Sequence, residues 1–150
     1  MMILEKKNKK KNVYKRILDD DLSIDKIHST SLLNLEQWEK TKEKICINDL
    51  KVGIIINSDD SLKNIEKNLS TFSIIQINFK TFKDGRPFTM AKELRKLHLY
   101  DKEIRASGHI LPDQYIFLTR CGFNSVEIKE EDKDDWIESY RMDEGLYYQP

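Results

Sequence analysis

Short runs of β-branched residues alternate with helix-patterned segments between residues 52 and 128, and this alternation restricts the possible folds most strongly. Strands are predicted at residues 52–56, 72–77, 104–106 and 126–128, and helices at 61–69, 89–97 and 112–122. Strands that are separated by single helices pair in parallel through right-handed crossovers. The sequence therefore predicts an α/β fold with about four parallel strands and crossover helices, arranged as an open doubly wound sheet or a half-barrel-like sheet.

One further helix is predicted on each side of this unit. Leucines and Trp38 recur at near-helical spacing, which predicts an N-terminal helix over about residues 32–44. The acidic segment around Trp136 is predicted to form a C-terminal helix that packs on the sheet or on a subunit interface.

The first residues differ in composition from the rest of the chain. Residues 1–12 are rich in lysine and lack hydrophobic periodicity, so we expect a disordered basic arm. A chain of 150 residues has the length of one domain, and residues 13–150 are predicted to form a single α/β domain. Within it, residues 13–18 could form a short edge strand.

Charge and hydropathy exclude several classes of partner. Lys and Arg together number 26, as do Asp and Glu, so no global positive field favours nucleic acid as a partner. The longest apolar runs, such as Ile54-Ile55-Ile56, are too short to cross a bilayer, and no secretory signal precedes the first lysines. We therefore expect a cytoplasmic protein without a membrane partner.

No cofactor or metal is predicted. The sequence contains no G-x-G-x-x-G, P-loop or C-x-x-C motif, and its two cysteines cannot hold an iron–sulfur cluster. Cys121 precedes Gly122 at the predicted end of a helix, where the helix dipole disfavours a thiolate. We interpret this cysteine as a small buried hydrophobic residue.

Three glycine-marked corners contain the candidate site residues. Two of them follow predicted strands, and ligands of parallel sheets bind beyond the carboxyl ends of the strands. The predicted ligand-binding residues are Asp84, Gly85, Arg86, Arg105, Gly108, His109, Asp113, Gln114 and Arg120. Arg86 offers a forked donor beside a helix N-terminus, which suits an oxyanion or the phosphate of a nucleotide.

Each of these residues also has a structural interpretation. Asp84 and Arg86 can hold the strand-to-helix turn through backbone hydrogen bonds. Arg105 lies in a strand covered on both faces and needs a partner, for which Asp84 and Asp113 are the candidates, so an ion pair and a ligand clamp both stay open. His109 precedes a helix whose dipole favours the neutral imidazole, which suits a hydrogen-bond donor, a weak base or a plain turn residue.

The motifs around these corners resemble a known bacterial family. They read F-K-T-F-K-D-G-R-P-F-T-M-A-K-E-L-R, E-I-R-A-S-G-H-I-L-P-D-Q and R-C-G-F, with Y-Y-Q-P at the end of the sequence. The chain resembles a domain family of unknown function whose members are often described as oxidoreductases involved in sulfite reduction. The resemblance is dense from Lys51 to Asn124 and implies a gene that lies beside those of sulfite reductase and phosphoadenylylsulfate reductase.

The resemblance implies an accessory protein in assimilatory sulfate or sulfite reduction. Such a protein would dock to sulfite reductase or its electron donor, or bind a sulfur oxyanion or a nucleotide at the strand-end crevice. A small enzyme acting on a sulfur metabolite and a structural subunit of a larger complex are the alternatives. The family description says oxidoreductase, whereas the sequence carries no redox cofactor motif, so enzymatic activity stays an open question.

Overall fold

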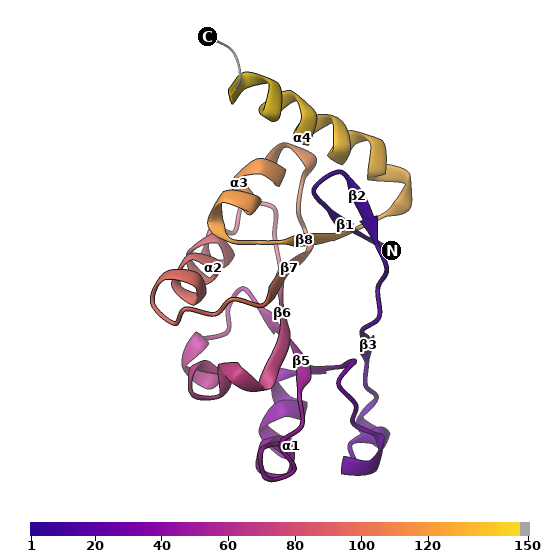
Figure 1. Cartoon of the computed structure of the whole chain (residues 1–150), viewed down its shortest axis with the longest axis vertical. Helices are drawn as coiled ribbons and strands as arrows, with labels where there is room; N and C mark the ends of the chain where they lie inside the picture. Colours follow the sequence, from indigo (N-terminus) through magenta and orange to yellow (C-terminus); the bar gives the residue numbers. More distant parts are fainter. Residues whose placement is uncertain (148–150) are drawn as a thin grey trace.

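The computed structural model describes residues 1–147, which form one curled, mixed sheet with helices packed against it (Figure 1). The strands are β1 (Met2–Glu5), β2 (Asn8–Lys10), β3 (Lys15–Arg16), β4 (Ser31–Asn34), β5 (Val52–Asn57), β6 (Phe72–Phe79), β7 (Glu103–Gly108) and β8 (Ser125–Ile128). Their order in the eight-stranded sheet is β2-β1-β8-β7-β6-β5-β4-β3. Strands β3 to β8 pair in parallel, whereas β1 pairs antiparallel with both β2 and β8.

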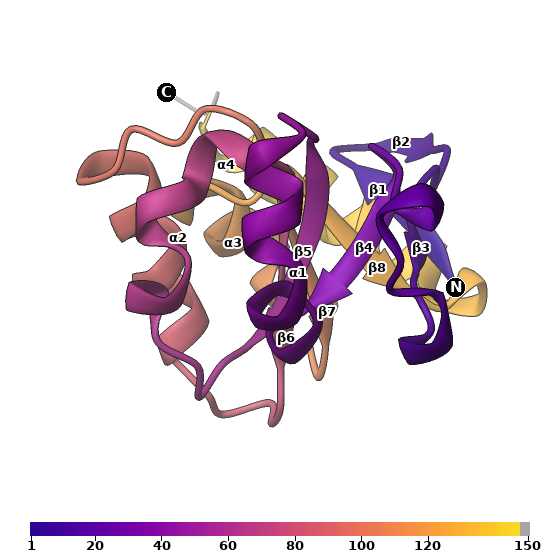
Figure 2. The ribbon, with the colours of Figure 1, turned by 90° about the horizontal axis from the view of Figure 1, so that it is seen from below.

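The α/β prediction is confirmed, and of the two arrangements considered the sheet is the half-barrel. The expectation of about four parallel strands was wrong, because the sheet is mixed and has eight strands. Successive parallel strands lie side by side in chain order, so every crossover steps in the same direction. Figure 2 shows the result, with α1, α2 and α3 on one side of the strands and β3 with the β1–β2 hairpin on the other.

Four α-helices accompany the strands within residues 1–147: α1 (Leu35–Ile47), α2 (Arg86–Lys96), α3 (Tyr115–Cys121) and α4 (Lys133–Tyr147). Helix α4 packs on α3, where the buried Trp136 and Tyr140 lie against the ring of Tyr115 with centroid separations of 5.2 and 5.4 Å. None of the helices in this part of the chain combines the length and the hydrophobicity needed to cross a bilayer. Residues 148–150, which belong to the Y-Y-Q-P motif, lie outside the described residues.

Two helices differ from the prediction for local reasons. The Asn34 side chain accepts a hydrogen bond from the Gln37 backbone, and Gln37 accepts one from Asn34 in return, so α1 begins at Leu35. The leucines before this capping box belong to β4, where both faces are buried. The predicted helix over 61–69 is replaced by two 3-10 turns, interrupted by the non-helical backbone of Asn68.

The N-terminal segment is ordered, and the prediction of a disordered arm over residues 1–12 was wrong. Met2, Ile3 and Leu4 are buried, and β1 pairs along β8, which would otherwise be an open edge of the sheet. A run of three apolar residues was sufficient here because the sheet supplied the hydrogen-bonding partner. Residues 11–14 then cross from β2 to β3, the two outermost strands, and so pass over the open side of the half-barrel (Figure 1).

Candidate functional site

A row of polar side chains lies at the carboxyl ends of the central strands, on the face opposite the helices. Asn57, Asn78 and Ser107 are neighbours in the β5–β6–β7 register. The Nδ2 group of Asn78 donates to Oδ1 of Asn57 at 3.2 Å, and the Ser107 hydroxyl donates to Oδ1 of Asn78 at 3.4 Å. In parallel sheets this end of the strands is where ligands bind.

A cavity of about 730 Å³, which we call the strand-end cavity, opens at this row. It is lined by Arg16, Asn34, Leu35, Glu36, Glu39, Ile55, Asn57, Asp60 and Asn78. The Asp60 carboxylate accepts a hydrogen bond of 2.7 Å from the Asn57 backbone, so it is held at the edge of the row. Three carboxylates and one guanidinium therefore face a single cavity with an amide floor.

Sequence reasoning did not identify these residues. Asn34, Asn57 and Asn78 each come at or next to the end of a β-branched or leucine-rich run, and this is the signal that was available. The prediction instead concentrated on residues near the glycine-marked corners, which are located in β7, in α2, in α3 and in the turns before these helices. None of the nine predicted ligand-binding residues lines the strand-end cavity.

Arg105 is fully buried on the inner face of the half-barrel, and its partners differ from the predicted Asp84 and Asp113. Its guanidinium donates to Glu103 at 2.9 Å, to Ser125 at 3.3 Å and to Asn12 at 3.2 Å. Glu103 lies two residues earlier on the same strand, and side chains two residues apart share one face of a strand. The prediction of a paired charge was correct, although the partner was wrong.

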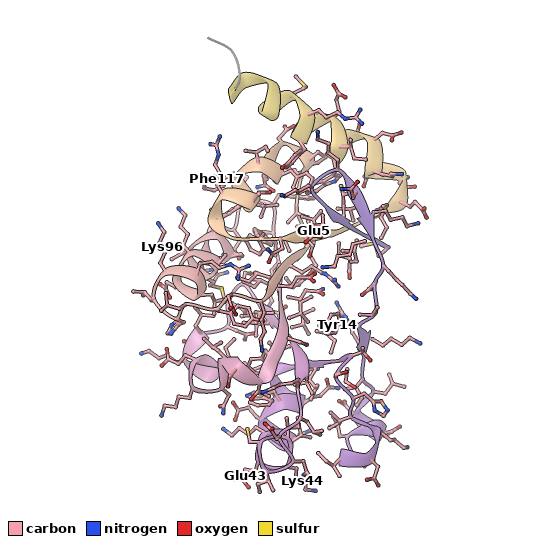
Figure 3. All side chains as sticks on the ribbon, viewed as in Figure 1. Glu5, Tyr14, Glu43, Lys44, Lys96 and Phe117 are labelled. Carbon is pink, nitrogen blue, oxygen red and sulfur yellow. The ribbon has the colours of Figure 1, made fainter. Side chains whose placement is uncertain are left out.

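This buried pair ties the N-terminal segment to the sheet. Lys10 of β2 donates to the other Glu103 oxygen at 2.6 Å, and the Tyr14 ring lies 5.8 Å from the Arg105 guanidinium, on the segment that crosses the open side (Figure 3). Burial alone would raise the pKa of Glu103, but Lys10, Ser125 and Arg105 hold it below its ordinary value. These contacts give Arg105 a structural role.

At the first predicted corner, Asp84 binds Arg86 rather than leaving it open to a ligand. The Asp84 carboxylate accepts one hydrogen bond from the backbone N–H of Arg86, at 3.1 Å. It also accepts two from the Arg86 guanidinium, each of 2.9 Å. The Arg86 guanidinium lowers the pKa of Asp84 well below its ordinary value. The start of α2 therefore carries an anion of its own, in the place where an oxyanion would bind. A Cβ on Gly85 would meet no atom within 4 Å, so this turn does not require glycine.

The second corner does require its glycine. Gly108 has φ of +87°, and a Cβ there would approach Oδ1 of Asn78 and the Phe79 carbonyl to 2.5 Å. His109 follows on the surface, where its backbone N–H donates to the Phe79 carbonyl at 2.9 Å and its ring meets Phe82 edge-on. Phe82 and His109 line a second cavity, of about 500 Å³.

The remaining predicted residues belong to α3 and the turn before it. Gln114 accepts a hydrogen bond from the Leu111 backbone at 2.9 Å, which is a capping contact. Asp113 and Arg120 are exposed on the turn and on the helix. Arg105 lies on the opposite face of the sheet, so the predicted residues do not converge on one site.

Two residues of the third motif have structural roles. Gly122 has φ of +118° and ends α3, and its carbonyl accepts two hydrogen bonds from Arg95 of α2, at 3.1 and 2.8 Å. Cys121 is buried, and burial raises the pKa of its thiol, in keeping with a small hydrophobic residue.

The helical side of the molecule exposes several large apolar side chains. Phe82 and Leu111 precede α2 and α3, and Phe88 and Phe117 lie in the first turns of these helices, so we call the four residues the aromatic surface. The rings of Phe88 and Phe117 are 4.7 Å apart, and the Lys92 ammonium lies 5.6 Å from the Phe117 ring. Phe82 and Phe117 are 49% and 48% exposed, and Figure 3 shows Phe117 on the outside of α3.

The fold and the strand-end row define a half-barrel α/β protein with a polar cavity at the carboxyl ends of its strands. A family model described as bacterial protein of unknown function (DUF934) matches residues 53–150, and the chain belongs to this family. The predicted membership of a bacterial family of unknown function is thereby confirmed. No curated protein and no solved structure matches the chain. The matched region runs from β5 to the C-terminus, so Arg16 and Asn34 of the strand-end cavity lie outside it.

Proposed function

We propose that this protein is an accessory protein of assimilatory sulfite reduction that docks, through the aromatic surface, to sulfite reductase or to its electron donor. The resemblance of the sequence motifs suggests the pathway. Docking is inferred from the exposed rings of Phe82 and Phe117. Aromatic side chains are enriched at the centres of protein interfaces, where their burial provides much of the binding energy.

Charge around the aromatic surface suggests the chemistry of the partner. Residues 80–96, which contain the loop before α2 and the helix itself, are predominantly basic. Their charged residues are Lys80, Lys83, Asp84, Arg86, Lys92, Glu93, Arg95 and Lys96. Glu127, Asp132 and Asp135 line the cavity beside Phe82 and Leu111, so the positive charge lies on the α2 side of the aromatic surface. That side favours a partner with an acidic surface and speeds their association at low ionic strength.

Docking is favoured over the binding of a sulfur oxyanion or a nucleotide phosphate. At the corner proposed for an anion, the Asp84 carboxylate already binds the fork of Arg86. The strand-end cavity holds more carboxylates than cations, which also disfavours an anionic ligand.

The test measures binding of the purified full chain to sulfite reductase and, separately, to its electron donor. Phe117→Ser is expected to weaken the affinity by about tenfold or more, because it removes a large ring from the interface. Ile47→Ser is the matched control, since Ile47 is 82% exposed at the end of α1, away from α2 and α3. Affinity should fall as salt is raised.

A growth assay connects binding to the pathway. A deletion strain that uses sulfate as its only sulfur source should be rescued by the wild-type gene and by Ile47→Ser, and poorly by Phe117→Ser at equal protein level. Absence of binding to both partners, or equal affinity of the two variants, would contradict the proposal.

A further inference from the structure

We propose that the strand-end cavity binds a small zwitterionic molecule of the amino-acid type, which bears an ammonium and a carboxylate group. This site shares no residue with the aromatic surface, so it goes beyond docking. At about 730 Å³ the cavity has the size of small-molecule sites, and it lies where parallel sheets bind ligands.

Among the described residues, the hydrogen bonds of two cavity-lining asparagines leave amide N–H groups available to donate. The Oδ1 atom of Asn34 accepts from the Gln37 backbone, and that of Asn57 accepts from Asn78. Within residues 1–147 the Nδ2 groups of Asn34 and Asn57 make no hydrogen bond in return. Together with the Arg16 guanidinium, these N–H groups suit the carboxylate of a ligand.

The carboxylates of the cavity suit an ammonium group. Asp60 is half-buried, and only its Oδ2 atom is used by the Asn57 backbone, so Oδ1 can accept from a ligand. Glu36 and Glu39 lie at the more exposed rim, where Lys40 and Lys42 approach them at 3.2 and 3.0 Å. Asp60 is therefore the carboxylate best placed to bind an ammonium in the cavity.

Gln76 is a buried polar side chain next to residues that line the cavity. Its side chain is fully buried, and neither amide atom has a hydrogen-bond partner among the described residues. Gln76 pairs in register with Ile55, which lines the cavity, and lies two residues before Asn78 on the same face of β6. Because Gln76 is fully buried and does not line the cavity, a ligand there would contact Asn57 and Asn78 rather than Gln76.

Two other ligand classes fit less well. A simple anion such as sulfate or phosphate would bring a second negative charge next to Asp60 and provide no ammonium group for it. A metal ion is also disfavoured, because no group of three or more His, Cys, Asp or Glu side chains within residues 1–147 could hold one.

The experiment measures binding of each common L-amino acid to the full chain by calorimetry, with inorganic sulfate and phosphate as probes that lack an ammonium group. At least one amino acid should bind, and Asp60→Asn and Arg16→Gln should each weaken its affinity by about tenfold or more. Asp60→Asn keeps an oxygen for the Asn57 backbone, so the fold is preserved. Asp59→Asn is the matched control, since the neighbouring Asp59 binds Lys80 and does not line the cavity.

Three outcomes would overturn the proposal. The first is that no amino acid binds to the wild-type protein. The second is that sulfate or phosphate binds more tightly than every amino acid. The third is that Asp59→Asn reduces affinity as much as Asp60→Asn does, which would indicate general charge rather than a site.

Discussion

Leu4→Ala tests whether the N-terminal segment is part of the folded core. Leu4 is 0% exposed, belongs to the main hydrophobic core and pairs with Val126 of β8. Truncation of a buried leucine to alanine costs about 2–5 kcal/mol, from the lost burial and the cavity left behind. In a chain of 150 residues, each kcal/mol lowers the melting temperature by about 2–4 °C, so we expect a fall of roughly 4–20 °C.

The assay is thermal and urea unfolding, monitored by circular dichroism. Leu18→Ala is the matched control, because Leu18 is 69% exposed and its truncation should change stability by no more than about 0.5 kcal/mol. If Leu4→Ala is as silent as Leu18→Ala, residues 2–5 do not contribute to the folded core and the reasoning is refuted.

Three further predictions concern charged and nucleophilic side chains. Glu103→Gln leaves Arg105 buried without a counter-ion. It should lower the free energy of unfolding, measured with urea at neutral pH, by about 3–5 kcal/mol. The pKa of Glu103 is lowered in the folded state, so the ionised carboxylate stabilises the fold above its unfolded-state pKa, and this stabilisation is lost as pH falls through the folded-state pKa. The difference in unfolding free energy between Glu103→Gln and the wild type should therefore shrink in acid. A pH-independent difference would contradict this. Cys121→Ser should lower the free energy of unfolding by on the order of 1 kcal/mol and keep function, and abolished function in a stable mutant would contradict this. In the native protein, iodoacetamide should modify the exposed Cys46 well before the buried Cys121. Equal rates of modification would contradict the buried state of Cys121. Arg86→Ala should preserve the fold, because that side chain is 61% exposed. It should weaken growth on sulfate, because it removes one of the basic side chains of residues 80–96 that favour an acidic partner. Full growth at wild-type protein level would contradict a role of Arg86 in docking.

The sequence was informative where local preference and tertiary structure agree. The β-branched runs of β5, β6, β7 and β8 and the helices α2 and α3 follow from periodicity, because buried parallel strands and amphipathic helices impose it on the sequence. Gly122 was placed at the end of a helix and the buried state of Cys121 was anticipated, as the structure shows. The need of Arg105 for a partner also followed from the sequence, because a charge in a covered strand is costly when unpaired.

Only the tertiary structure decided which segments and side chains meet. Met2–Glu5 has no periodicity of its own and becomes a strand because β8 offers an unpaired edge, a partner more than a hundred residues away. The Arg105 partner was set by the two-residue repeat of β7, and the strand-end cavity by the register that aligns Asn57 with Asn78. Pairing and register depend on contacts between residues distant in the chain, which local sequence patterns do not encode. For this reason the sequence predicted the strands and helices of the half-barrel, while the cavity, the N-terminal strand and the aromatic surface required the folded structure.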